Sequence, residues 1–115
     1  MRGATVLLAG IALLAAGGTA EAQRASPVDG NKLLGICTRG QSGAAPCDAY
    51  INGVADAAVA LAGEGKLQLC IPQTVTGIQM RDVTVKWLRA HPEERQHQAG
   101  VLVLRALREA FPCKG

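Results

Sequence analysis

Four cysteines are the residues of this sequence whose chemistry is most constrained: Cys37, Cys47, Cys70 and Cys113. An even number of cysteines in a short chain that carries a secretion signal is typical of a disulfide framework. A zinc site is the alternative, but no two cysteines have the C-x-x-C spacing and neither histidine forms a ligand pair with one of them. We therefore expect structural disulfides, no metal, no cofactor and no nucleophilic thiol.

The other side chains that could support catalysis are isolated from one another. Nucleophilic catalysis needs a nucleophile, a base and a group that orients the base. His91 precedes a proline at an expected helix start, and His97 lies in a polar stretch. Asp56, within a run of small residues, is the best single candidate for a special carboxylate, but such residues are usually exposed or paired with an arginine. We expect that the protein is not an enzyme, and a catalyst acting on the cell envelope is the least favoured hypothesis.

The first 22 residues have the three parts of a secretory signal peptide. Arg2 supplies the positive charge, residues 4–16 form an apolar run, and residues 20–22 (Ala-Glu-Ala) match the pattern that signal peptidase recognises. The run is shorter than the roughly 20 apolar residues of a spanning helix. We therefore expect cleavage after residue 22, no stable membrane anchor, and a mature periplasmic domain of residues 23–115.

Apolar spacing predicts a small all-α domain of four helices, with a fifth as the alternative. A first helix follows a cap at Asp29 or Asn31, and a second runs from about Cys47 to Ala62. Loops are expected at residues 39–46 and 66–72, and Gly63 and Gly65 are expected to end the second helix. The β-branched residues 83–85 leave a strand as a minority alternative within the third helix.

The third and fourth helices have the clearest start signals. Thr76 and Gln79 have the spacing of a capping box. Pro92 suits the first position of the fourth helix, with two glutamates in its first turn. From Ala99 to Ala110 the apolar residues recur at helical spacing.

Helix packing predicts which cysteines pair. The short connection at His91-Pro92 predicts an antiparallel pair of helices. The end of the fourth helix then returns to the start of the third, which places Cys113 beside Cys70. Cys37 and Cys47 bracket the first loop and can close it. Four cysteines allow three pairings, and this geometry favours Cys37–Cys47 and Cys70–Cys113, with chain-entropy contributions of about 3 and about 4 kcal/mol.

The net charge of +3 raises the question of which partner a basic domain would bind. Nucleic acid is the obvious class, but the export signal and the scarcity of aromatic residues (3%) argue against it. Two interpretations remain, solvated helix faces or a basic face that meets an acidic protein partner. The basic residues of the last two helices are Arg81, Lys86, Arg89, Arg95, Arg105 and Arg108.

Motifs that carry a family resemblance extend over most of the expected mature domain. They are Asn31-Lys32-Leu33-Leu34 ahead of Cys37; the run from Cys47 to Val54 with Asp56; Cys70-Ile71-Pro72 followed by Val75-Thr76 and Gln79; the run from Trp87 to Glu93; and Ala106-Leu107 leading to Ala110-Phe111-Pro112-Cys113. Together they resemble the Rap/Tai-type domain of immunity proteins against peptidoglycan amidase effectors of type VI secretion.

The resemblance implies a periplasmic, all-helical, disulfide-containing domain that is often a homodimer, and whose best-known members plug the active-site cleft of a secreted peptidoglycan amidase. The shared motifs are mostly scaffold, so they do not assign the partner contacts. A small periplasmic chaperone of the acid-stress type, or another envelope binding protein, is the alternative function. A cleft-plugging binder presents a protruding loop, and either glycine-rich loop could do so or could be a passive connector. The candidate contact residues are Arg39, Gln41 and Ser42 in residues 39–43, and Glu64 and Lys66 in residues 63–66.

Overall fold

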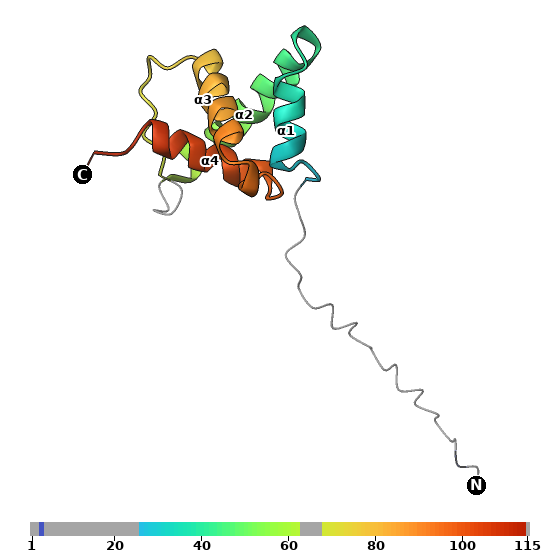
Figure 1. The fold of residues 1–115 in the computed structure, drawn as a ribbon. Helices are drawn as coiled ribbons and strands as arrows, with labels where there is room; N and C mark the ends of the chain where they lie inside the picture. Colours follow the sequence, from blue (N-terminus) through green and yellow to red (C-terminus); the bar gives the residue numbers. More distant parts are fainter. Residues whose placement is uncertain (1–2, 4–25, 63–67, 115) are drawn as a thin grey trace.

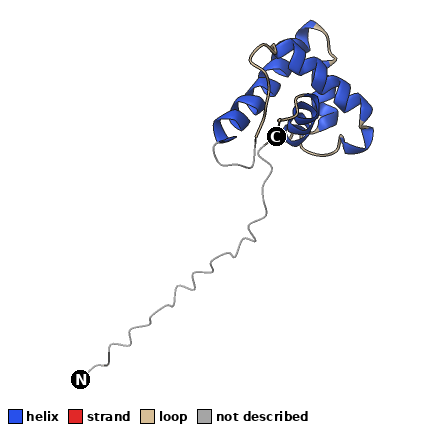
Figure 2. Cartoon of the chain, turned by 90° about the vertical axis from the view of Figure 1, so that its left-hand side faces the viewer, coloured by secondary structure: helices blue, strands red, loops and turns tan. Residues whose placement is uncertain are grey.

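The computed structural model describes residue 3 and residues 26–62 and 68–114, and the regular elements in these parts are helical (Figures 1 and 2). This confirms the predicted small all-α fold of four α-helices. The expected signal peptide lies almost entirely outside the described residues. The elements are α1 (Gly30–Cys37), α2 (Gln41–Leu61), α3 (Gly77–Ala90), the short 3₁₀ helix η2 (Pro92–Glu94) and α4 (Ala99–Ala110).

Side chains cap two helices where the sequence predicts. The carboxylate of Asp29 accepts a hydrogen bond from the amide of Lys32 at 2.8 Å, which begins α1. At the start of α3, the Thr76 hydroxyl accepts from the Gln79 amide at 3.2 Å, and the Gln79 side chain accepts from the Thr76 amide at 2.8 Å. The capping box is thus confirmed, and the strand alternative for residues 83–85 is excluded because they lie within α3.

The second helix begins six residues earlier than the predicted Cys47, because α2 starts at Gln41 and includes Pro46. The composition of residues 39–46 predicts a loop, since proline cannot donate a backbone hydrogen bond in a helix. The disulfide between Cys37 and Cys47 and close packing against α1 hold this segment helical at the cost of one such bond.

The fourth helix begins later than predicted, at Ala99 instead of Pro92. Pro92 starts only the 3₁₀ turn η2. The segment that follows bonds to the start of α1, because the carbonyls of Arg95 and His97 accept from Asn31 and Gly30, both at 3.0 Å. These bonds satisfy the free amides of α1 and replace the helical bonds that residues 95–98 would otherwise make.

The apolar stripe of α4 lies at the centre of the core. Its buried residues meet a fully buried leucine or isoleucine from each of the other α-helices, namely Leu33, Ile51 and Leu88. Such an arrangement lets one amphipathic helix organise the whole domain. The buried residues of α4 are Ala99, Leu102, Val103, Ala106 and Leu107.

The packing of α3 against α4 differs from the expected antiparallel pair. In Figure 1, α4 runs across α3 instead of alongside it. The indole N–H of Trp87 in α3 donates to the carboxylate of Glu109 in α4 at 2.8 Å and links the two helices. The end of α4 still reaches the segment before α3, where Cys113 forms a disulfide with Cys70.

No helix among the described residues combines the length and apolar character that a membrane crossing requires.

Candidate partner-binding site

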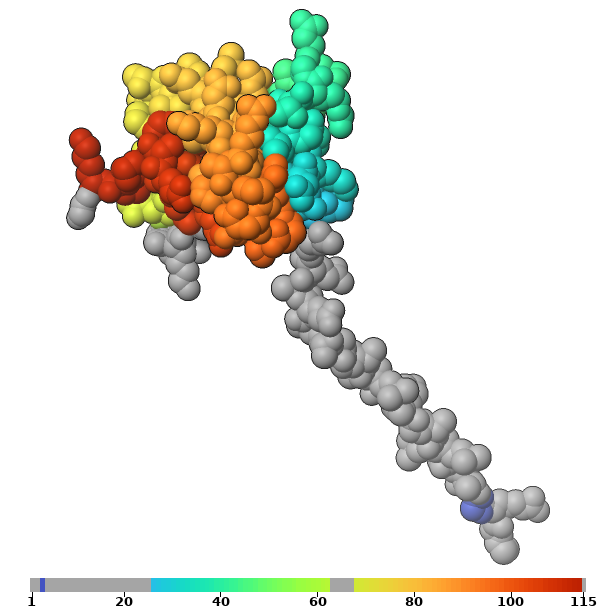
Figure 3. Space-filling view, in the orientation of Figure 1, coloured from blue at the N-terminus to red at the C-terminus, as the bar shows by residue number. Residues whose placement is uncertain are grey.

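The most prominent feature of the described surface is the turn between α1 and α2, which we call the α1–α2 tip (residues 38–43). It projects beyond the neighbouring helices in Figures 1 and 3. Gly40 has a φ of 79°, a left-handed conformation that glycine adopts without steric cost. This residue allows the chain to reverse between the end of α1 at Cys37 and the start of α2 at Gln41.

Two constraints make the α1–α2 tip rigid. The disulfide between Cys37 and Cys47 ties the end of α1 to α2 directly beneath it. Gly43 is buried against the carbonyl group of Ile36, so closely that a Cβ atom at this position would overlap with the carbonyl oxygen. The backbones of the two helices are therefore in direct contact, which restricts the conformations open to the tip.

Three of the predicted contact residues belong to this tip. Arg39 lies in the turn, and Gln41 and Ser42 form the first residues of α2 instead of a loop. All three are exposed. The other two candidates, Glu64 and Lys66, lie outside the described residues.

An open groove separates the α1–α2 tip from α3. Its volume is about 580 Å³, and a second hollow of about 310 Å³ adjoins it and includes Gln41. Both hollows are lined by Cys37, Gly40 and Arg81, so they flank the same arginine and the same disulfide. The remaining residues that line the larger groove are Thr38, Asp82, Val85, Lys86 and Arg89.

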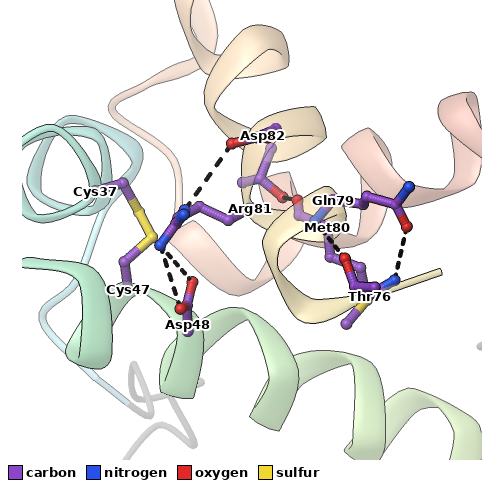
Figure 4. Close-up of polar contacts among 9 residues, drawn as sticks. Cys37, Cys47, Asp48, Thr76, Gln79, Met80, Arg81 and Asp82 are labelled. Carbon is purple, nitrogen blue, oxygen red and sulfur yellow. Dashed lines mark hydrogen bonds and ion pairs between the residues drawn. A yellow bond between two sulfur atoms is a disulfide. The ribbon is translucent and has the colours of Figure 1, made fainter.

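Arg81 holds the base of this groove together (Figure 4). Its Nη1 atom donates to both carboxylate oxygens of Asp48 at 3.2 Å, and its Nε atom lies 4.0 Å from a carboxylate oxygen of Asp82. The first contact joins α3 to α2 beside the disulfide, and the two side chains are only 23% and 31% exposed. Arg81 is therefore largely committed to the scaffold.

Lys86 and Arg89 are the cations of the groove that remain available. Both are exposed. Among the described residues, no carboxylate lies within 4.0 Å of either side chain, whereas Arg105 in α4 pairs with Glu94 at 3.0 Å. A negatively charged partner could thus bind Lys86 and Arg89 without displacing an internal ion pair.

The sequence did not indicate the pairing of Arg81 with Asp48, because the two residues are 33 positions apart. Asp56, the carboxylate that the sequence singled out, is exposed. The sequence did contain a pattern that indicates the wall of the groove. Arg81, Val85 and Arg89 are spaced by four residues and therefore lie on one face of a helix. That face forms one wall of the groove.

The two histidines make local contacts and do not line the groove. The ring of His91 stacks on Trp87 with ring centroids 4.0 Å apart, and its Nδ1 atom lies 2.8 Å from the Trp87 carbonyl oxygen. His97 lies 3.5 Å from a carboxylate oxygen of Glu94. Within residues 26–62 and 68–114, no group of three potential ligands is placed to hold a metal ion.

Comparison with known proteins identifies the family. A model of the family described as Rap1a immunity proteins matches residues 29–113, from the cap of α1 to the last cysteine. No curated protein and no solved structure matches the chain. The matched segment contains α1 to α4 and both disulfides, so the chain belongs to the family of Rap1a immunity proteins.

Proposed function

We propose that this protein is a periplasmic immunity protein that binds and inhibits a peptidoglycan amidase effector of type VI secretion. Membership of the Rap1a family supports immunity against an effector protein. The observation that supports the proposal most strongly is the α1–α2 tip, whose residues 38–42 are exposed and project from the domain, while a disulfide and close packing at Gly43 constrain it.

A constrained tip favours binding in a cleft for a thermodynamic reason. Association orders mobile side chains and loops, and this ordering reduces affinity. The disulfide Cys37–Cys47 and the contact of Gly43 with Ile36 fix the backbone of the tip before binding. Arg39, Gln41 and Ser42 are thus presented on a fixed backbone, and inhibition follows from steric exclusion of substrate without catalysis by the immunity protein.

The disulfides also support an exported location. Both bridges form within the described residues, and no free cysteine remains. Disulfides persist in oxidising compartments such as the periplasm and are rare in the cytosol. Export through cleavage after residue 22 would deliver the domain to the compartment in which a peptidoglycan amidase acts.

We also propose that the mature protein forms a homodimer, as the family resemblance implies. Light scattering of the oxidised protein over a range of concentrations tests this. A mass that stays at that of one chain would contradict it.

A protection assay tests the proposed function. Peptidoglycan amidase effectors of type VI secretion are directed, one at a time, to the periplasm of a bacterial host, with and without the full-length protein. We expect lysis without the protein and growth with it. Arg39→Glu/Ser42→Trp should reduce protection, because it changes the charge and size of the tip, whereas Lys114→Glu near the C-terminus should not. Lysis despite periplasmic accumulation of the protein would contradict the proposal.

A further inference from the structure

The groove between the α1–α2 tip and α3 has an excess of positive charge. Arg81, Lys86 and Arg89 line it, against the single carboxylate of Asp82, which leaves a net charge of +2. Arg81 is engaged by Asp48, so the positive charge that faces solvent comes mainly from Lys86 and Arg89. Both project from the exposed face of α3.

The spacing of these cations restricts what they can bind. Lys86 and Arg89 are three residues apart in a helix, which places their Cβ atoms about 5–6 Å from each other. In an extended segment, side chains two residues apart lie on the same side and are about 7 Å from each other. Two carboxylates at alternate positions of an extended acidic segment therefore match this pair of cations.

We propose that this groove receives an extended acidic segment of the effector, with carboxylates at alternate positions. This rests on the proposed immunity function, because it assigns one surface and one partner chemistry to that interaction. The α1–α2 tip forms one wall of the groove and Lys86 and Arg89 lie on the other. Contact of the tip with the effector would therefore bring the acidic segment to α3.

Exposed charge pairs affect the rate of association more than the final affinity. Each exposed pair changes the affinity by only about 1.4-fold to 5-fold, whereas complementary charge can raise the association rate constant tenfold or more at low salt. The expected signature is thus an association rate that falls steeply as the salt concentration rises.

The experiment compares two double variants of the oxidised mature protein. Lys86→Glu/Arg89→Glu removes the two cations of the groove that face solvent and keeps Arg81. Lys32→Glu/Lys114→Glu makes the same change in net charge at two exposed positions outside the groove lining. The association rate constant with an amidase effector from whose toxicity the protein protects cells is measured in about 20 mM and about 300 mM NaCl, which spans weak and strong screening.

We expect the groove variant to associate about tenfold more slowly at low salt, and the control variant to remain within about twofold of the unmodified protein. Equal losses in both variants would show that net charge acts diffusely and would overturn the proposal. Unchanged association in the groove variant would also overturn it, while leaving the immunity function intact.

A second measurement does not require the effector. A hexapeptide with blocked termini and the sequence Glu-Ser-Glu-Ser-Glu-Ser is titrated into isotopically labelled mature protein, and amide resonances are followed. We expect saturable shifts at residues 81–89 that are absent in the groove variant, present in the control variant, and absent with the Gln-Ser analogue. The proposal would be overturned by shifts at other residues, by the absence of shifts, or by stronger binding of phosphatidylglycerol vesicles through residues 81–89.

The peptide test and the immunity function can fail separately. If the peptide shifts residues 81–89 but no amidase binds the protein, the groove still recognises acidic segments and the immunity function is contradicted.

Discussion

At Gly43, the backbones of α1 and α2 lie so close together that no side chain fits between them. Gly43→Ala should lower the free energy of unfolding by about 1–3 kcal/mol, because the new methyl group forces the helices apart. Gly53→Ala in the same helix is the matched control, since a Cβ atom there would have no atom within 4 Å. Alanine is the better helix former by about 1 kcal/mol, so this control should stabilise the protein.

Urea unfolding of both variants measures this difference. Equal stability of the two alanine variants would contradict the close contact of the helices at the α1–α2 tip. Gly43→Ala should also weaken effector binding, because it displaces the exposed residues that follow Gly40.

Individual residues were predictable from the sequence where their partners are close in the chain. Asp29 caps the amide three residues later, and Thr76 and Gln79 satisfy each other's amides. The ion pair of Arg81 with Asp48 was not predictable, because it depends on how α2 and α3 pack. Local hydrogen bonds follow from spacing, whereas contacts between helices require the tertiary structure.

At the scale of elements, the two disulfides have different structural roles. Cys37–Cys47 constrains the α1–α2 tip across a sequence separation of 10, whereas Cys70–Cys113 joins the segment before α3 to the end of α4 across a separation of 43. Cys47 is fully buried, but Cys70 is half-buried and Cys113 is exposed. Removing the second bridge therefore tests chain entropy with little loss of packing.

The double variant Cys70→Ala/Cys113→Ala should lose up to about 4 kcal/mol of stability, the chain-entropy contribution of the longer loop. Urea unfolding of the oxidised proteins measures this loss. Because the bridge lies away from the α1–α2 tip, the folded variant should keep its affinity for the effector. Effector affinity of the variant is measured at urea concentrations at which the variant is still folded. A loss of affinity under these conditions would contradict the assignment of the tip as the binding surface.

Helix boundaries were less predictable than the helices themselves. α2 begins before Pro46 because a disulfide and a glycine contact hold its first turn against α1. α4 begins after residue 98 because the preceding carbonyls bond to the start of α1. In both cases, contacts with α1 outweigh the local preference of proline, for a loop at Pro46 and for a helix start at Pro92.

At the scale of the whole molecule, the all-α class and the apolar stripe of α4 followed from composition and periodicity. The groove did not, because it is formed by the end of α1, the turn after it and α3 together, and only its basic face on α3 could be recognised in the sequence. The functional account combines family membership, which indicates a protein effector, with a constrained tip and an adjoining basic groove.

Inhibition of the effector enzyme tests this account most directly. The oxidised mature protein is titrated into a peptidoglycan amidase effector from whose toxicity it protects cells, and hydrolysis of purified peptidoglycan is followed. We predict that activity falls to zero at a stoichiometric amount of the immunity protein, with a Kd below about 1 µM, which corresponds to about 8 kcal/mol of binding free energy. Full amidase activity in the presence of a large molar excess of the protein would contradict the account.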